Sequence, residues 1–331
     1  MSDDAANDAN DMTPLLPRPT PNPPQADSHP IYLRACHSPW KSINQKALLA
    51  IRTIVAGYLT AVMVVSLIYK LGNGDDHGPL RIPFQFSTVA NVLLWAYHMQ
   101  VTLWTGMHLF MPRSIEDDPE MCHGHMLRVR IARVLSPPEK VDSYNKRFTF
   151  SMFYTIAHVF TFMNTLIYWG ILVPTGHGGF KPPTMPHHDH PSSISTANGT
   201  PITLYDADKG LFEEGPLKAF SIINVWTITS LIAVIEILFL NSIRRQNPVA
   251  GHVYGCVFLS AVYLAWAGLG ILLTGHGGLF FLDPKLMGDV PGANIAAGLA
   301  FISMTPGIFA YMYGLIAMRE TVTAAQRSSS Q

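Results

Sequence analysis

Long apolar stretches separated by polar segments fill the chain from about residue 49 to about residue 318. About 20 apolar residues of helix are enough to cross the hydrocarbon core of a bilayer. The pattern therefore predicts six membrane-spanning helices, at about 49–70, 87–111, 149–173, 219–242, 252–273 and 294–318. The second and fourth stretches also carry polar residues, so we expect these two helices to face their neighbours. The sixth contains Pro306 and Gly307, which membrane helices tolerate.

The polar segments divide the chain into a membrane domain and two tails. Residues 1–45 are acidic and then proline-rich, a composition that predicts a disordered tail. This tail has no basic segment followed by an apolar core, so it does not read as a cleavable signal peptide. Residues 46–320 form the predicted all-α, six-helix domain, with a long loop at 174–218, and residues 321–331 form a second tail.

The composition agrees with a polytopic membrane protein. Only 13% of the residues are charged and 48% are hydrophobic, whereas soluble domains carry about 25% charged residues. The net charge is zero, so we expect no nucleic-acid partner. The three cysteines, Cys36, Cys122 and Cys256, have neither the number nor the spacing of a disulfide framework or a metal site.

Lysine and arginine predict the orientation of the helices, because cytoplasmic loops carry an excess of both. Most of the 22 such residues lie in the two tails and in the loops at 112–148 and 243–251. Both termini are therefore predicted to be cytoplasmic and the 174–218 loop lumenal. Asn198 begins an Asn-Gly-Thr glycosylation sequon in that loop, and a glycan there would agree with this topology.

The pentapeptide Thr-Gly-His-Gly-Gly occurs twice, at 175–179 and at 275–279. The third and fifth helices run in the same direction, so His177 and His276 are both predicted at the lumenal ends of helices. The two histidines can be read as parts of one active site. The alternative is that both copies are only helix ends, because glycine commonly ends helices.

Thr88 begins the second predicted helix, and Asn91 follows one turn later on the same face. A threonine hydroxyl becomes an effective nucleophile when a base takes its proton. The alternative is structural, because threonine is also a favoured N-cap residue.

Four polar residues inside the predicted helices are further candidates. His98 and His158 lie near the middle of the second and third helices, and an ionisable residue at such a depth suggests function. They could equally be neutral and hydrogen-bonded to each other or to Asn164. Glu236, near the cytoplasmic end of the fourth helix, needs a partner or a polar cavity unless it extends to the inner surface. Asn224 lies near the lumenal start of that helix.

Three short motifs lie outside the helices. His187–His190 (His-His-Asp-His) and Cys122–His125 (Cys-His-Gly-His) contain transition-metal ligands, but the first lies in a loop without a scaffold and the second has weak ligand spacing. Residues 11–16 have the acidic-dileucine form of an endosomal or vacuolar sorting signal. Because the two groups of metal ligands lack a scaffold or a suitable spacing, we expect no metal and no cofactor.

The region around the fifth predicted helix resembles the androgen-induced membrane protein family, a six-span group related to the rolling-stone proteins. The residues that carry this resemblance are Gln246-Asn247-Pro248, Tyr263-x-x-Trp266, Thr274-Gly275 and Phe281-Leu282-Asp283. Thr88-x-x-Asn91 at the start of the second helix is similar to the family as well.

The resemblance implies a threonine hydrolase that cleaves fatty acid esters of hydroxy fatty acids, with Thr88 as the nucleophile. The histidine of the family is missing, because its position falls on Trp226 or Ile228 in this chain. His276, and after it His177, are then the candidate bases, because both are predicted at the same lumenal mouth as Thr88.

The sequence thus predicts a lipid-ester hydrolase-like protein of the endomembrane system, with membrane lipid as its partner. We expect it in the endoplasmic reticulum, with vacuolar, endosomal or plasma membranes as alternatives. The alternative function is a non-catalytic multi-pass protein that binds lipid or a partner, or transports a small solute.

Overall fold

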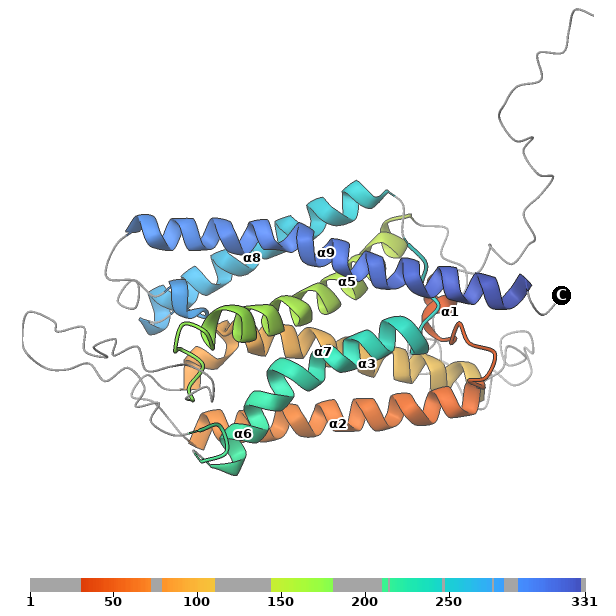
Figure 1. Ribbon diagram of the computed structural model, residues 1–331, viewed down its shortest axis with the longest axis horizontal. Helices are drawn as coiled ribbons and strands as arrows, with labels where there is room; N and C mark the ends of the chain where they lie inside the picture. Colours follow the sequence, from red (N-terminus) through yellow and green to blue (C-terminus); the bar gives the residue numbers. More distant parts are fainter. Residues whose placement is uncertain are drawn as a thin grey trace, which may run out of the picture.

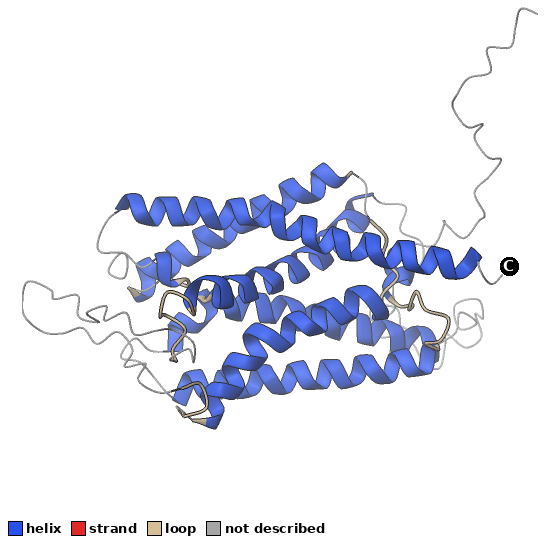
Figure 2. Ribbon diagram, in the orientation of Figure 1, coloured by secondary structure: helices blue, strands red, loops and turns tan. Residues whose placement is uncertain are grey.

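A computed structural model describes the membrane domain and parts of the segments around it. The described residues are 31–72, 79–110, 144–180, 210–213, 215–245, 248–275, 277–282 and 291–328. Every regular element within these residues is a helix, and the long helices lie side by side (Figure 2). The all-α prediction is confirmed for this part of the chain.

Helices occupy all six predicted positions. Five of these positions hold α2 (Gln45–Gly72), α3 (Phe86–Phe110), α5 (Tyr144–Ile167) with its π-helical continuation η4 (Tyr168–Leu172), α8 (Val249–Thr274) and α9 (Pro291–Ser328). The fourth position holds α6 (Pro216–Ile223), η5 (Asn224–Ile228), α7 (Thr229–Ile235) and η6 (Glu236–Leu240), in which η5 and η6 are π-helical turns.

Among the described helices, five are long and apolar enough to cross a membrane. They are Gln45–Gly72, Tyr144–Leu172, Pro216–Leu240, Val249–Thr274 and Pro291–Gln326. The chain is therefore a multi-pass membrane protein. The second predicted span, α3, is not among these five, and a sixth crossing stays a prediction.

The polar residues of α3 face neighbouring helices, as the sequence predicts. α3 packs against α2 on one side and α5 on the other, and Tyr97, His98 and Thr105 are completely buried between them. α5 lies in the middle of the bundle, where it also contacts α7, α8 and α9 (Figure 1). The fourth helix buries Asn224 and Glu236 in the same way.

Residues 31–44, immediately before α2, are ordered, which differs from the predicted disorder of this part of the 1–45 tail, whereas residues 1–30 lie outside the described residues. The ordered segment contains α1 (Ile31–Ala35), whose Tyr32 ring packs at 5.5 Å from the ring of Trp104 and at 5.2 Å from that of Phe150. These aromatic contacts offset the cost of ordering the segment, although its proline-rich surroundings suggest disorder. α9 likewise continues to Ser328, beyond the predicted end of the membrane domain at residue 320.

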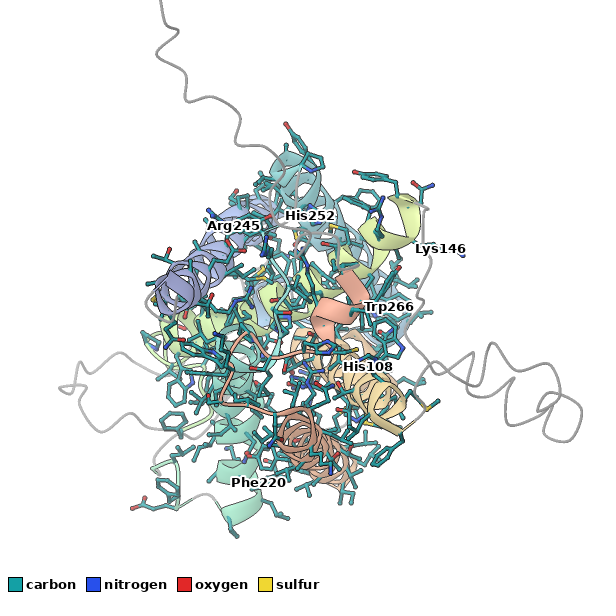
Figure 3. All side chains as sticks on the ribbon, turned by 90° about the vertical axis from the view of Figure 1, so that its right-hand side faces the viewer. His108, Lys146, Phe220, Arg245, His252 and Trp266 are labelled. Atoms are coloured by element: carbon teal, nitrogen blue, oxygen red, sulfur yellow. The ribbon has the colours of Figure 1, made fainter. Side chains whose placement is uncertain are left out.

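The bundle has two ends, and the 28 residues of α2 separate them by about 42 Å at about 1.5 Å per residue. The arginine end comprises residues 31–45, 241–245 and 319–326. In Figure 1 it is the end where α1 and the C-terminal turns of α9 lie, and Figure 3 views the molecule from this side. The threonine end comprises residues 79–88, 175–180 and 277–282, at the far end of α2.

Candidate functional site

The two copies of the repeated pentapeptide are helix ends that lie side by side at the threonine end. Gly176 and Gly275 have left-handed backbone conformations, with φ of 79° and 76°. The Gly275 amide donates to the Ile271 carbonyl at 2.8 Å and caps α8. The His177 ring stacks on Phe280, which follows the second copy, at 4.9 Å between ring centroids. The helix-end interpretation is therefore confirmed for these glycines.

The described contacts of His177 do not include Thr88. The Nδ1 atom of His177 lies 3.2 Å from the hydroxyl of Thr175, and the His177 ring stacks on that of Phe280. His276 lies outside the described residues, so its assignment as a base stays a prediction.

Two residues of the Tyr-x-x-Trp motif fix the backbone that leads into α3. This backbone forms η2 (Pro79–Phe84), a 3-10 helix. The Tyr263 hydroxyl donates to the Phe84 carbonyl at 3.0 Å, and the Trp266 indole donates to the Pro83 carbonyl at 3.0 Å. The motif on α8 therefore holds the backbone of the segment before Thr88 in place through two hydrogen bonds.

Gly278, from the second pentapeptide, touches the same segment. A Cβ atom at this position would lie 1.7 Å from the carbonyl oxygen of Phe84, so only glycine fits. The Phe86 amide donates to the Gly278 carbonyl at 3.1 Å. Tyr263 and Trp266, two of the described residues that carry the family resemblance, therefore lie against the segment that leads into α3. Asp283 lies outside the described residues.

Thr88 lies inside the first turn of α3, because the helix begins at Phe86. The N-cap interpretation of Thr88 is therefore wrong. Its hydroxyl is half-buried and accepts a hydrogen bond of 2.9 Å from the Nζ atom of Lys70, in the last turn of α2. The same Nζ donates to the Gln85 side-chain oxygen at 2.6 Å.

Lys70 is not among the site residues that the sequence suggests, where it counts only as one of the charges that set the topology. A signal was present, because consecutive predicted spans are antiparallel, so the first helix ends and the second begins at the same face of the membrane. The end of the first helix and the start of the second must then be close. The two positions where the histidine of the family would fall hold Trp226 and Ile228, whose side chains cannot accept a proton. Trp226 stacks on Tyr168 at 4.0 Å, and Ile228 packs on the core.

The two asparagines proposed as site residues have different surroundings. Asn91 is half-buried, one turn beyond Thr88. Asn224 is buried, accepts a hydrogen bond from the Tyr58 hydroxyl and donates to the Phe220 carbonyl at 2.7 Å. Asn224 therefore joins the fourth helix to α2 and does not contact Thr88.

A second polar cluster lies deep in the bundle around Glu236. Its Oε1 atom accepts from the Arg52 guanidinium at 3.2 Å and from the Tyr97 hydroxyl at 2.9 Å. Arg52 and Glu236 are both fully buried. Arg52 is thus the partner that the sequence requires for Glu236, and the alternative that Glu236 extends to the surface is wrong.

His98 and His158 belong to this cluster, with rings 5.5 Å and 5.0 Å from that of Tyr97. His158 Nδ1 bonds to the Tyr154 carbonyl at 2.7 Å, whereas Asn164 donates to the backbone of the fourth helix. Among these described residues, the two histidines therefore form neither of the predicted hydrogen bonds, to each other or to Asn164. Both ring nitrogens of His98, and His158 Nε2, have no hydrogen-bond partner in the described part of the chain.

The remaining sequence motifs lie outside the described residues. They are the acidic-dileucine motif at 11–16, Cys122–His125, His187–His190 and Asn198. Within the part that the structure describes, no group of three or more histidine, cysteine or acidic side chains could hold a metal ion.

Comparison of the chain with protein-family models, with curated proteins and with solved structures gives no match. The resemblance carried by Thr88, Tyr263 and Trp266 therefore stays a prediction. The site has to be judged by its own geometry, which consists of a threonine, a lysine and a glutamine at one end of a membrane bundle.

Proposed function

We propose that the protein hydrolyses lipid esters, with Thr88 as the nucleophile and Lys70 as the general base. One observation carries the proposal, namely the 2.9 Å separation between Lys70 Nζ and Thr88 Oγ1. This is the distance at which a nucleophile and its base exchange a proton. Pairs of a hydroxyl nucleophile with lysine are a known variant of the catalytic triad.

The reaction begins with Lys70 as a neutral amine. The Thr88 oxygen forms a bond to the ester carbonyl carbon, while its proton moves to Lys70. The tetrahedral intermediate then breaks its bond to the alcohol, which leaves with the proton from Lys70. Water attacks the acyl-threonine in the same manner, releases the fatty acid and restores the Thr88 hydroxyl.

Gln85 is the orienting group in this scheme. Its side-chain oxygen lies 2.6 Å from Lys70 Nζ, so it holds the amine beside Thr88. A base that is itself oriented by a third group is typical of activated nucleophiles.

The surroundings of Thr88 suit a substrate that comes from the bilayer. Three aliphatic side chains near the end of α2 and the start of η2 are strongly exposed, namely Ile68 at 61%, Leu71 at 51% and Leu80 at 71%. They provide an apolar surface beside a polar site, where an acyl chain can remain in lipid while its ester group reaches Thr88. The substrate class we propose is therefore a fatty acid ester.

The test uses a fluorophosphonate probe, which labels activated hydroxyl nucleophiles, on the purified full-length protein. We expect labelling of the wild type and none of Thr88→Ala. Lys70→Met should reduce the labelling rate about 100-fold or more, because general bases contribute about 10²–10⁴-fold. The matched control is Thr53→Ala, since Thr53 is an exposed threonine on α2 and should not matter.

Three outcomes would count against parts of this proposal. No labelling of the wild type, or equal labelling of Thr88→Ala, would exclude Thr88 as the nucleophile. If Thr88→Ala abolished labelling and Lys70→Met did not, the base would have to be sought elsewhere. His276→Ala and His177→Ala would then test the two histidines that the sequence suggests.

A non-catalytic role is the second candidate, and the cluster around Glu236 favours it. Buried ionisable groups with unused hydrogen-bonding atoms occur on proton and solute pathways of membrane proteins. His98, His158 and Glu236 have such atoms. If this role holds, vesicles containing the protein should pass protons or a solute, His98→Phe should abolish the flux, and Thr88→Ala should leave it unchanged.

A further inference from the structure

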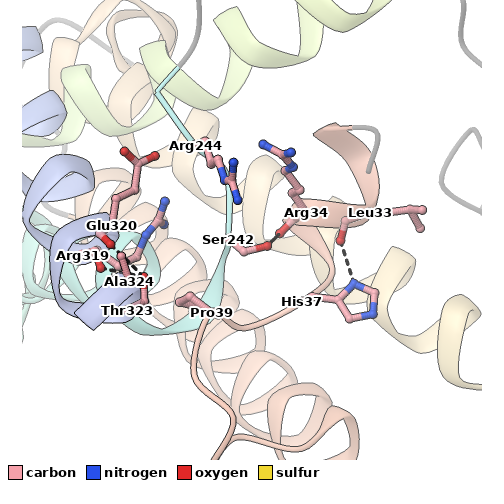
Figure 4. A pocket seen from close by; sticks show the side chains of 10 residues that line it. All are labelled: Leu33, Arg34, His37, Pro39, Ser242, Arg244, Arg319, Glu320, Thr323 and Ala324. Atoms are coloured by element: carbon pink, nitrogen blue, oxygen red, sulfur yellow. Dashed lines mark hydrogen bonds between the residues drawn. The ribbon is translucent and has the colours of Figure 1, made fainter. Parts of the chain in front are cut away.

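A cavity of about 530 Å³ lies at the arginine end, far from Thr88 (Figure 4). Its walls come from three segments that are distant in the sequence. These are α1 with the residues after it, the extended segment 241–245, and the last turns of α9. The volume lies within the range of about 300–1,000 Å³ that is usual for ligand sites.

The lining of this cavity carries an excess of positive charge. Among the described residues that line it, three contribute a guanidinium group, namely Arg34, Arg244 and Arg319, and one, Glu320, contributes a carboxylate. This carboxylate is already engaged, because its two oxygens accept from the backbone amide and the side chain of Arg245 at 3.0 and 2.9 Å. An anionic ligand would therefore be favoured here.

Hydrogen bonds hold the walls of the cavity in place. Arg319 is buried and donates to backbone carbonyls of Ile237 at 2.7 Å and Asn241 at 2.8 Å, which anchors α9 to the end of the fourth helix. The amide and the hydroxyl of Ser242 both donate to the Arg34 carbonyl, at 3.0 and 2.9 Å. The backbones that carry Arg34 and Arg244 are thus joined, and both side chains extend from them into the cavity region (Figure 4).

We propose that this cavity binds a phosphate group, with the guanidinium groups of Arg34 and Arg244 as the main contacts. The planar fork of arginine matches phosphate oxygens in pairs, and arginine is over-represented where such recognition matters. The cavity is larger than one phosphate requires, so it has room for the molecule that carries the group.

The position of the cavity points to a membrane headgroup as the carrier of the phosphate. The cavity lies beside Leu240, where the fourth span ends, and near Gln45, where the first begins. The lysine and arginine distribution predicts this end to be cytoplasmic, and basic pockets on that side bind phosphorylated headgroups. The site is about one α2 length from Thr88, so it is separate from the proposed hydrolase site.

The experiment measures binding to the full-length protein in detergent after removal of lipid. The probes are dioctanoyl phosphatidylinositol 4-phosphate, dioctanoyl phosphatidylcholine, inositol 1,4-bisphosphate and inorganic phosphate. The test variant is Arg34→Gln with Arg244→Gln, and the matched control is Lys46→Gln, because Lys46 is an exposed cation at the same end that does not line the cavity. A third variant, Arg34→Lys with Arg244→Lys, keeps the charge without the planar fork.

We expect the inositol phospholipid to bind with an affinity that falls as salt increases, and phosphatidylcholine to bind at least tenfold more weakly. The double glutamine variant should lose at least tenfold in affinity, the lysine variant should lose less, and Lys46→Gln should stay within twofold. Binding of the phospholipid alone would assign the site to a headgroup, and equal binding of inositol bisphosphate or inorganic phosphate would assign it to soluble phosphate. No binding of any phosphate compound to the wild type, or equal losses in the test and control variants, would overturn the proposal.

Discussion

The buried ion pair between Arg52 and Glu236 makes a strong prediction about stability. Glu236→Gln removes one charge and changes the side-chain volume very little, so Arg52 is left buried with neutral acceptors. Its remaining partners are the Thr105 hydroxyl at 2.6 Å and the backbone carbonyls of Val101 at 3.3 Å and Leu240 at 2.7 Å. These bonds keep the guanidinium solvated but do not neutralise it.

The expected magnitude follows from the geometry. Two unit charges 3.2 Å apart, the separation in this pair, attract by about 5 kcal/mol at an effective dielectric constant of about 20. The glutamine oxygen retains a hydrogen bond that is worth about 1 kcal/mol. We therefore expect Glu236→Gln to lower the free energy of unfolding by about 3–5 kcal/mol, the range found when one partner of a buried pair is removed.

The assay is unfolding of the full-length protein in mixed micelles by added SDS, followed by circular dichroism. Arg52→Met should lose a similar amount, since it leaves the Glu236 carboxylate buried without a counter-charge. The double variant Arg52→Met with Glu236→Gln should lose clearly less than the two single variants together, because neither charge remains. Additive losses, or a loss below about 1 kcal/mol for Glu236→Gln, would refute the reasoning.

Three further predictions test other parts of the molecule. Gly278→Ala should lower the free energy of unfolding by about 3 kcal/mol in the same SDS titration, because its Cβ atom would meet the Phe84 carbonyl. The control Gly268→Ala should change it little, because no atom lies within 4 Å of the added Cβ atom. Burial raises the pKa of the Cys36 thiol to about 12, so about one molecule in 10⁴ carries the thiolate at pH 8. Because the thiolate is the reactive form, maleimide should label Cys36 only after unfolding. Rapid labelling of the native protein would contradict this. A glycosidase-sensitive mobility shift should disappear in Asn198→Gln, and a cytoplasmic Asn198 would contradict the predicted topology.

The positions of the helices could be predicted from the sequence because long apolar stretches are a strong signal. The predicted starts and ends agree with the described helices to within a few residues at most ends. The segment after residue 30 was missed because prediction by composition averages over a window rich in proline. The contacts that order it are individual aromatic pairs such as Tyr32 with Trp104, and a composition cannot reveal these pairs.

Side-chain pairs between helices could not be predicted, because they depend on how each helix is rotated about its axis. The sequence shows that Glu236 needs a partner, but several arginines could supply it. Arg52 does so because α2 and the fourth helix place these two positions at the same depth. Lys70 differs, because the sequence does place the end of the first helix and the start of the second at the same face, but the charge of Lys70 agrees equally well with a role in topology alone.

The surroundings of Arg52 and Lys70 differ, and this difference is why we propose a structural role for Arg52 and a chemical role for Lys70. Arg52 is held by a carboxylate in a fully buried ion pair, so its contacts stabilise one arrangement of the helices. Lys70 contacts an amide oxygen and a hydroxyl, both of which are neutral. The hydroxyl can accept from the ammonium or donate to the amine, so the contact persists when the proton moves. If Lys70 is the base, the labelling rate of Thr88 must therefore rise with pH as the neutral amine forms. A pH-independent rate in the wild type would leave Lys70 with a purely structural role.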